Sequence, residues 1–427
     1  MSRGPTLGRR WRRAIPVVFV TYSLAYLDRV NYGLAAAAGM AGDLRITPAV
    51  SSLAAALFFA AYFLFQIPGA VYAERRSVKK LVFGCLLAWG ALAALTGCVD
   101  RIWELLLVRF LLGVAEAAVM PAMIIYLSRW FGRAERSRAN TFLILGNPVT
   151  IVWMSVLSGY IAHSLGWRWM FVLEGVPSVI WAFAWWGLAD DFPAKAGWLA
   201  EDEKQRLGGM LALEQLALPP VRNYRAAFGS RPVQFLCAQY FCWSLGLYGF
   251  VLWLPSILRH ASQVGMVGTG WLSALPYAAA VPAMLAASLV SDRRRDRRTF
   301  VWPFLLAAGI AFYGSFALGT SHAGLSYALL VVAGIGMYAP YGPFFAIVPE
   351  MLPSNVAGGA VALINSSGAL GGFCGSYLVG YLDSLTGSAS ASYLLMSASL
   401  VASALLTVLS VPRGPAAAQS PGAVPQP

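Results

Sequence analysis

The sequence predicts an all-α membrane protein with 12 transmembrane helices in two pseudo-symmetric six-helix bundles and both termini in the cytoplasm. Three observations predict this class. The 427-residue chain is 59% hydrophobic and only 11% charged, whereas soluble domains carry about 25% charged residues. Its apolar residues form runs of about 20 residues, the length that crosses a bilayer. Its basic residues gather on one side of those runs, which is typical of membrane proteins.

The apolar runs divide into two predicted bundles, at residues 14–190 and 232–411. The first contains runs at 14–38, 50–73, 81–98, 103–127, 139–162 and 169–190. The second contains runs at 232–258, 264–290, 300–319, 324–347, 357–381 and 391–411. A cytoplasmic arm (1–13), a polar cytoplasmic central loop (191–231) and a disordered tail rich in Pro and Ala (412–427) complete the predicted organisation. The first run is long enough to span, so we interpret it as a helix rather than a secretory signal.

The positions of the 31 Lys and Arg residues set the predicted orientation. Nearly all of them flank the runs on the side that the two termini share, and the opposite side has only Arg45, Arg101, Arg168 and Arg259. Since cytoplasmic loops carry the excess of basic residues, we expect both termini in the cytoplasm. The net charge of +13 is then explained by topology determinants near anionic headgroups. No nucleic-acid partner is predicted.

Four charged residues fall inside predicted spans, where each costs about 2.5–3.5 kcal/mol on insertion scales. Asp28 and Arg29 lie in the first span, and Arg109 and Glu116 lie on one face of the fourth. Two acids and two bases predict a polar cavity between these spans. Arginine suits a carboxylate ligand, and buried carboxyl groups can exchange protons. A purely structural ion-pair cluster is the alternative interpretation.

Neutral polar side chains also interrupt the apolar runs. Several donors and aromatic rings together suit a polyhydroxylated ligand, although each one alone also fits a helix–helix hydrogen bond. These residues are Tyr26, Asn31, Tyr62, Gln66, Asn147, Gln239, Tyr248, Tyr338, Tyr341 and Asn365. Pro121, Pro340 and Pro343 predict helix kinks. The sequence contains no metal-ligand spacing, nucleotide-binding loop or nucleophile–base pair, so we predict neither an enzyme nor a bound metal or cofactor.

Four stretches carry a resemblance to a known family. They are Tyr26-Leu27-Asp28-Arg29-Val30-Asn31, Gln66-Ile67-Pro68-Gly69 with Glu74, Arg75 and Lys79, Arg109-Phe110-Leu111-Leu112-Gly113-Val114-Ala115-Glu116, and Trp167-Arg168-Trp169-Met170-Phe171 with Glu174-Gly175. On these motifs the chain resembles the major facilitator superfamily, in its anion:cation symporter branch, over residues 10–412. Ala70 and Ser77 depart from the glycines usual in the second motif. The run from Met337 to Pro353 is most similar to bacterial 2-ketogluconate transporters.

The resemblance implies a monomeric, proton-coupled symporter that imports a sugar-acid anion such as 2-ketogluconate across the bacterial inner membrane by alternating access. It implies that Asp28 and Glu116 carry protons, Arg29 binds the substrate carboxylate, and Arg109 modulates the two acids. Glu74, Arg75 and Lys79 would form the conformational loop motif.

The predicted substrate contacts are Tyr26, Asn31, Tyr62, Asn147, Gln239, Tyr338, Tyr341 and Asn365. Three alternatives remain open at this point: import of another organic anion (an aldonate, glucarate or tartrate), efflux of amphipathic compounds, and a receptor that does not transport.

Overall fold

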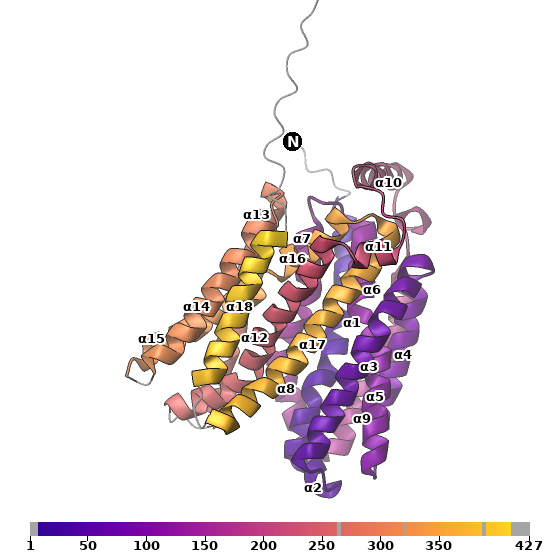
Figure 1. Ribbon diagram of the computed structural model, residues 1–427. Helices are drawn as coiled ribbons and strands as arrows, with labels where there is room; N and C mark the ends of the chain where they lie inside the picture. Colours follow the sequence, from indigo (N-terminus) through magenta and orange to yellow (C-terminus); the bar gives the residue numbers. More distant parts are fainter. Residues whose placement is uncertain (1–6, 263–265, 320, 387–389, 411–427) are drawn as a thin grey trace, which may run out of the picture.

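The structure, a computed structural model, describes residues 7–262, 266–319, 321–386 and 390–410. Within these residues every regular element is a helix, and the helices run side by side in two groups (Figure 1). The side chains of Asp28 and Arg29 and the predicted tail 412–427 lie outside the described residues. The predictions made for them are therefore neither supported nor opposed by the structure.

The first bundle begins near the N-terminus and ends at Leu188. Its elements are α1 (Leu7–Ala35), the π-helical turn η1 (Ala36–Met40), α2 (Ala41–Asp43), α3 (Pro48–Arg75), α4 (Val78–Thr96), α5 (Ile102–Ala117), α6 (Val119–Trp130), α7 (Arg136–Ile144), α8 (Gly146–Leu165) and α9 (Trp167–Leu188). Hydroxyl side chains cap two of these helices, because Thr47 accepts from the Val50 amide (3.3 Å) and Ser77 from the Lys80 amide (3.0 Å).

The segment between the bundles is more ordered than a polar loop. It holds the 3₁₀ turn η2 (Pro193–Lys195) and the helices α10 (Glu201–Leu216) and α11 (Tyr224–Phe228). Glu201, Asp202 and Glu203 occupy the first turn of α10, where negative charge stabilises a helix N-terminus. Asn223 caps α11 by accepting from the Ala226 amide at 3.0 Å. The segment predicted as a polar cytoplasmic central loop over 191–231 thus contains two helices whose local signals were not used.

The second bundle repeats the pattern of long helices. Its elements are α12 (Arg231–Ser262), α13 (Met266–Arg294), the 3₁₀ turn η3 (Arg298–Phe300), α14 (Trp302–Leu318), α15 (Ala323–Tyr338), α16 (Tyr341–Met351), α17 (Ser354–Thr386) and α18 (Ser390–Ser410). Within this bundle α12 packs along α17, and α14 lies between α15 and α18.

Nine segments of the described chain are long and apolar enough to cross a membrane. Large apolar side chains cover their outer surfaces, and Ile180 and Phe183 are each 65% exposed, as expected of side chains in contact with lipid. The helices α1, α8 and α12, with 29, 20 and 32 residues, also have the length to span. The arrangement with twelve spans and cytoplasmic termini stays a prediction.

Three long helices break near their middle, next to a proline. The α5–α6 break lies at Ala118, three residues before Pro121. The α7–α8 break lies at Leu145, three residues before Pro148, and the α15–α16 break lies at Ala339 and Pro340. Because proline has no amide proton, it removes a helical hydrogen bond and permits a change of direction. The kinks expected at Pro121 and Pro340 therefore occur.

The two bundles touch mainly at one end. The helix α7 packs against α13 and α16, while α3 and α6 pack against α17. Figure 1 shows the bundles converging at the end that carries α10 and α11 and diverging toward α2 and the α14–α15 turn. The basic loops predict that the converging end is cytoplasmic. The bundles are thus held together at the predicted cytoplasmic end.

Candidate functional site

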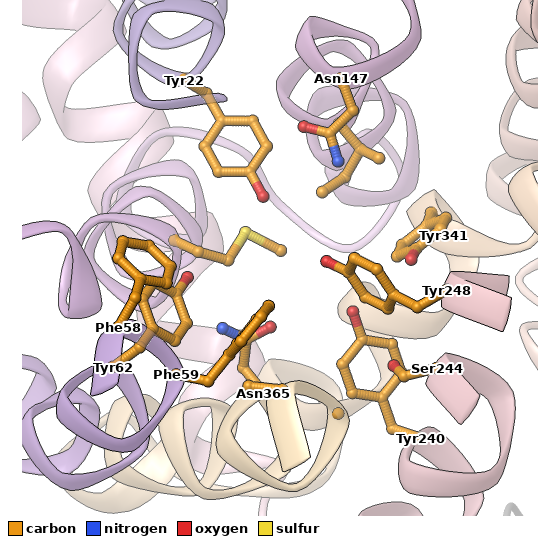
Figure 2. A pocket seen from close by; sticks show the side chains of 14 residues that line it. Tyr22, Phe58, Phe59, Tyr62, Asn147, Tyr240, Ser244, Tyr248, Tyr341 and Asn365 are labelled. Carbon is orange, nitrogen blue, oxygen red and sulfur yellow. The ribbon is translucent and has the colours of Figure 1, made fainter. Parts of the chain in front are cut away.

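A cavity lies between the bundles, near the three helix breaks, and the empty space in it and at its open side amounts to about 470 Å³. Its walls come from eight helices of both bundles and consist of aromatic rings, amides, one serine, two apolar side chains (Met120 and Ile144) and small residues (Figure 2). The lining residues are Tyr22, Phe58, Phe59, Tyr62, Met120, Ile144, Asn147, Tyr240, Ser244, Tyr248, Tyr341, Asn365, Gly368 and Ala369. This lining offers hydrogen bonds without a formal charge and apolar ring faces, a mixture that can bind a small polar molecule.

Phenol hydroxyls converge on the cavity from both bundles. Figure 2 shows Tyr22 and Tyr248 reaching into the space from opposite sides, with the Asn147 amide directed into it as well. A phenol hydroxyl both donates and accepts hydrogen bonds. The cavity can therefore satisfy ligand hydroxyl groups in either role.

Ring packing holds the aromatic side chains of the cavity in place. Tyr62 stacks on Phe58 with centroids 5.9 Å apart, and Tyr240 stacks on Phe344 at 5.2 Å. Tyr341 lies 4.4 Å from Trp243. Since such contacts fix ring orientation, the hydroxyl groups are positioned before any ligand arrives.

Four predicted substrate contacts line this cavity: Tyr62, Asn147, Tyr341 and Asn365. Four others, Tyr26, Asn31, Gln239 and Tyr338, are buried at 7% exposure or less and do not line it. The predicted carboxylate ligand Arg29 has a side chain outside the described residues.

Sequence reasoning did not select Tyr22, Tyr240 and Ser244, which line the cavity. One signal was available: Tyr240, Ser244 and Tyr248 recur every four residues, the spacing of one helix face.

One buried hydrogen bond joins the two bundles at the cavity wall. The Asn365 amide on α17 donates to Gln66 Oε1 on α3 at 2.8 Å. Gln66 is 0% exposed and Asn365 is 7% exposed. Because a buried amide that loses its partner carries a full desolvation cost, this bond links the position of α17 to that of α3.

The two described members of the predicted charge cluster lie inside the first bundle. Arg109 and Glu116 on α5 are 6% and 0% exposed, so neither faces lipid. The Arg109 guanidinium lies 4.0 Å from the ring centroid of Tyr32 on α1, a cation–π contact. This contact joins α5 to α1, and the polar cavity expected between these helices stays a prediction.

A further buried carboxyl group, Glu174 on α9, joins three helices of the first bundle. Its side chain accepts from the Asn31 amide on α1 at 3.0 Å and from the Ser158 hydroxyl on α8 at 2.5 Å. These bonds direct Asn31 toward α9, which explains why this residue does not line the cavity.

A dense ionic contact fastens the bundles at the predicted cytoplasmic end. Glu350 on α16 accepts from Arg297 (2.7 Å) and from Arg133 of the first bundle (3.3 Å). Asp292 on α13 binds Arg297 (2.8 Å) and Arg138 (3.0 Å). Arg297 lies in the connection between α13 and α14, and although burial lowers its pKa, the two carboxylates outweigh this effect and raise the pKa overall.

The predicted conformational motif contributes a second contact at this end. Glu74 accepts from the Tyr224 hydroxyl (2.7 Å) and from the Gly358 amide of α17 (3.0 Å). Arg75 lies over the Tyr224 ring at 5.1 Å, while Lys79 lies over Trp186 of its own bundle at 5.1 Å. Burial and the Glu74 carboxylate raise the pKa of Tyr224 to about 12.

Glu74 and Asp292 occupy equivalent places in the two bundles and make equivalent contacts. Each accepts a backbone amide near the start of a helix in the opposite bundle: Gly358 of α17 for Glu74, and Ser137 and Arg138 of α7 for Asp292. A helix N-terminus favours negative charge. In the sequence Glu74 is followed by Arg75 and Arg76, and Asp292 by Arg293 and Arg294. This weak internal repeat thus corresponds to a pair of contacts between the bundles.

Comparison with known proteins identifies relatives over almost the whole length. The profile described as Major Facilitator Superfamily matches residues 18–376 and 268–426. A protein from Agrobacterium vitis with tartrate as its proposed cargo is 31% identical over 417 residues, which cover 96% of this chain and 92% of that protein. The D-galactonate transporter of Escherichia coli O6:H1 is 25% identical, with 92% of this chain and 94% of the relative covered.

The fold comparison agrees with the sequence comparison. The solved structure of the proton:xylose symporter XylE, bound to 6-bromo-6-deoxy-D-glucose, superimposes with a TM-score of 0.78. The match covers 95% of this chain and 97% of the other at 13% sequence identity. At this identity the likeness concerns the arrangement of helices only.

Proposed function

This chain belongs to the Major Facilitator Superfamily, and from that premise we propose that it imports a sugar-acid monoanion of the 2-ketogluconate class together with protons. It is a transporter rather than an enzyme, a multi-pass protein of the bacterial inner membrane whose relatives include organic-anion carriers. We propose that it works as a monomer by alternating access.

One observation carries the proposal: a cavity between the bundles that presents neutral hydroxyl and amide groups next to a bundle with buried charges. Tyr22, Tyr62, Tyr248 and Asn147 supply hydrogen bonds suited to a polyhydroxylated carbon chain. The arginines of the first bundle supply the positive charge that a carboxylate requires. A sugar acid combines these two chemical groups in one molecule.

In this proposal, proton coupling depends on two acids of the first bundle, Asp28 and Glu116. In this proposal the substrate carboxylate binds Arg29 and draws that positive charge away from the neighbouring carboxyl groups. Since a nearby cation favours the ionised carboxylate, its loss favours uptake of a proton by Asp28 or Glu116. Arg109 then modulates the same equilibrium. Glu116, at 0% exposure, has the burial that such a proton carrier needs.

The contacts at the predicted cytoplasmic end supply the second element of the cycle. The ion pairs of Glu350 with Arg133 and of Asp292 with Arg138 hold the bundles together there, so the cavity would load from the opposite side. Their separation would release substrate and protons into the cytoplasm. Glu74 and Arg75, which contact α11 and α17, would take part in this step.

Reconstitution into proteoliposomes tests the proposal directly. Initial uptake of labelled 2-ketogluconate should rise with an inward proton gradient and should fall when a proton ionophore is added. Asp28→Asn and Glu116→Gln should abolish accumulation while exchange of internal for external substrate persists. An unchanged rate with the ionophore, or full accumulation by Asp28→Asn, would refute proton coupling through these acids.

A second candidate, import of a different organic anion, is favoured by the names of the relatives, which include tartrate and galactonate. A thermal-shift panel of 2-ketogluconate, gluconate, glucarate, galactonate and tartrate separates these substrates. Transport that survives Arg29→Ala would instead favour an efflux carrier for amphipathic compounds. Binding without flux in the same liposomes would favour a receptor.

A further inference from the structure

The two walls of the cavity differ in chemistry. The wall from the first bundle combines the apolar side chains of Phe58, Phe59, Met120 and Ile144 with the polar ones of Tyr22, Tyr62 and Asn147. In the second bundle, every lining residue except Gly368 and Ala369 has a hydroxyl or amide side chain. The buried charges Arg109 and Glu116 belong to the first bundle. A ligand with one charged and one hydroxylated end would therefore turn its hydroxylated end toward the second bundle.

The hydroxyl groups of the second wall are concentrated on one helix face. Tyr240, Ser244 and Tyr248 follow one another at four-residue intervals on α12, so they form one stripe along the cavity. Figure 2 shows the three side chains stacked along the same side of the space. Ser244 is 1% exposed and Tyr240 is 6% exposed, so their positions are set by the protein interior.

Glycines on α17 create the room for these two tyrosine rings. A Cβ atom at Gly372 would lie 2.5 Å from the Tyr248 ring, closer than real Cβ contacts. A Cβ atom at Gly368 would overlap the Tyr240 ring and would lie 2.9 Å from Ser244 Oγ. The two glycines, four residues apart on α17, thus face two tyrosines that lie eight residues apart on α12, and any larger residue would push the rings out of place.

We infer that the Tyr240–Ser244–Tyr248 face of α12 recognises the hydroxyl groups of the transported acid and thereby determines its specificity. Gly368 and Gly372 are positioning residues that seat the two rings. A site built to hydrogen-bond ligand hydroxyls rejects analogues without them, because its own polar groups then lose their partners. This inference rests on the proposed function. It assigns recognition of the ligand hydroxyl groups to this face of the second bundle.

The test compares D-gluconate with hexanoate, which has the same carbon chain and carboxylate without the hydroxyl groups. Dissociation constants are measured by calorimetry on the full-length, detergent-purified protein. Wild type should bind gluconate more tightly than hexanoate. Tyr248→Phe and Tyr240→Phe should each weaken gluconate binding by about 3- to 10-fold, the effect of one lost hydrogen bond. They should leave hexanoate binding within about twofold, because the ring faces remain.

Gly372→Ala serves as an independent variant, since it displaces the Tyr248 ring without removing the hydroxyl. Like the tyrosine variants, it should reduce the preference for gluconate over hexanoate. The matched control is Tyr377→Phe, which removes the same atom from a side chain that is 61% exposed on the outside of α17. This control should keep the wild-type preference, and size-exclusion profiles identify any variant that fails to fold.

The outcomes separate the inference from the proposed function. If wild type binds gluconate no better than hexanoate, the sugar-acid proposal fails and the inference fails with it. If wild type binds gluconate more tightly than hexanoate but both tyrosine variants keep the same ratio of the two dissociation constants, only the inference is overturned. Equal weakening of both ligands by Tyr248→Phe also overturns it, because that pattern indicates a structural role.

Discussion

The two places where the bundles meet are built from opposite kinds of polar group. The cavity lining described here consists of neutral side chains, among them Tyr22, Tyr248 and Asn147. The contact at the predicted cytoplasmic end consists of ionised pairs, with Glu350 and Asp292 each bound to arginines of both bundles. Only a few helical turns of α7 and α16 separate these regions.

The difference reflects what each region must do. A contact that opens and closes exchanges its partners for water, and charged groups are well solvated when they separate. A ligand site must instead discriminate between ligands. Preorganised neutral donors and acceptors do so because a ligand without matching groups leaves them without hydrogen-bond partners. We therefore expect mutations at the cytoplasmic contact to alter the balance of conformations and mutations in the cavity to alter selectivity.

Breaking the ionic contact has the largest expected effect. Glu350→Gln removes the carboxylate that Arg297 and Arg136 share, and leaves Arg297 with Asp292 and Arg136 with Glu214. Removing one partner of a buried pair costs up to about 3–5 kcal/mol. The cytoplasmic contact should then open. Alkylation of Asn140→Cys, at a position that is 0% exposed, should become at least about tenfold faster from the cytoplasmic side.

The matched control for this prediction is Glu201→Gln, which removes an acid whose side chain is 74% exposed on α10. An exposed ion pair contributes little, so alkylation should keep its wild-type rate. If Glu350→Gln does not speed the alkylation of Asn140→Cys, the ion pairs do not hold this end closed.

The next largest effect is expected where α7 crosses α16. A Cβ atom at Gly342 would lie 2.6 Å from the Ser137 carbonyl oxygen and would overlap the Thr141 hydroxyl. Such overpacking costs about 1–3 kcal/mol, and Gly342→Ala should slow uptake roughly tenfold by opposing closure. Gly324→Ala, at a position with nothing within 4 Å, should leave uptake unchanged. Equal rates for the two variants would contradict the close crossing.

A smaller effect is expected at the Gln66–Asn365 bond. Either single change, Gln66→Leu or Asn365→Leu, leaves one buried amide without its partner and should cost about 1–3 kcal/mol of unfolding free energy. The double variant should be close to wild type in stability, since both polar groups are removed. The melting temperatures of all four proteins measure this coupling, and strictly additive losses would exclude it.

The smallest effect is expected at the exposed edge of the cytoplasmic contact. Tyr224→Phe removes the hydrogen bond to Glu74 and should cost about 1 kcal/mol. The pKa of Tyr224 is raised from 10.0 to about 12. The hydroxyl is therefore fully protonated and donates its hydrogen bond below the unperturbed pKa of 10.0, and it loses its proton only as pH rises through about 12. The difference in stability between wild type and Tyr224→Phe should therefore stay constant from neutral pH to about pH 9. Tyr313→Phe, on the outer surface of α14, is the control.

Local sequence features were sufficient for much of the fold. The apolar runs predicted the long helices, and Pro121 and Pro340 predicted two of the helix breaks. The charges of α5 predicted burial for Arg109 and Glu116, and both are buried. In contrast, the central segment was predicted as a polar cytoplasmic loop although it contains α10, because the acidic residues of its first turn were not used as a helix signal.

Such reasoning from the sequence identified only part of the cavity lining. Tyr62, Asn147, Tyr341 and Asn365 were selected and line it, whereas Tyr22, Tyr240 and Ser244 line it and were not selected. Gln239 was selected next to Tyr240 and is buried elsewhere. Neighbouring residues on a helix point about 100° apart, so the identity of the inward face depends on how the helix is rotated against its neighbours.

The sequence by itself determined that this chain crosses the membrane as long helices, on which side its basic loops gather, and which spans carry charge. These properties follow from the transfer of single side chains between water and lipid, which composition and order fix locally. Only the tertiary structure decided that Glu74 and Asp292 meet helices of the opposite bundle and that Gly368 and Gly372 seat tyrosines from α12. Those contacts depend on the rotation and crossing of helices distant in the chain, and such packing has no periodic signature in one dimension.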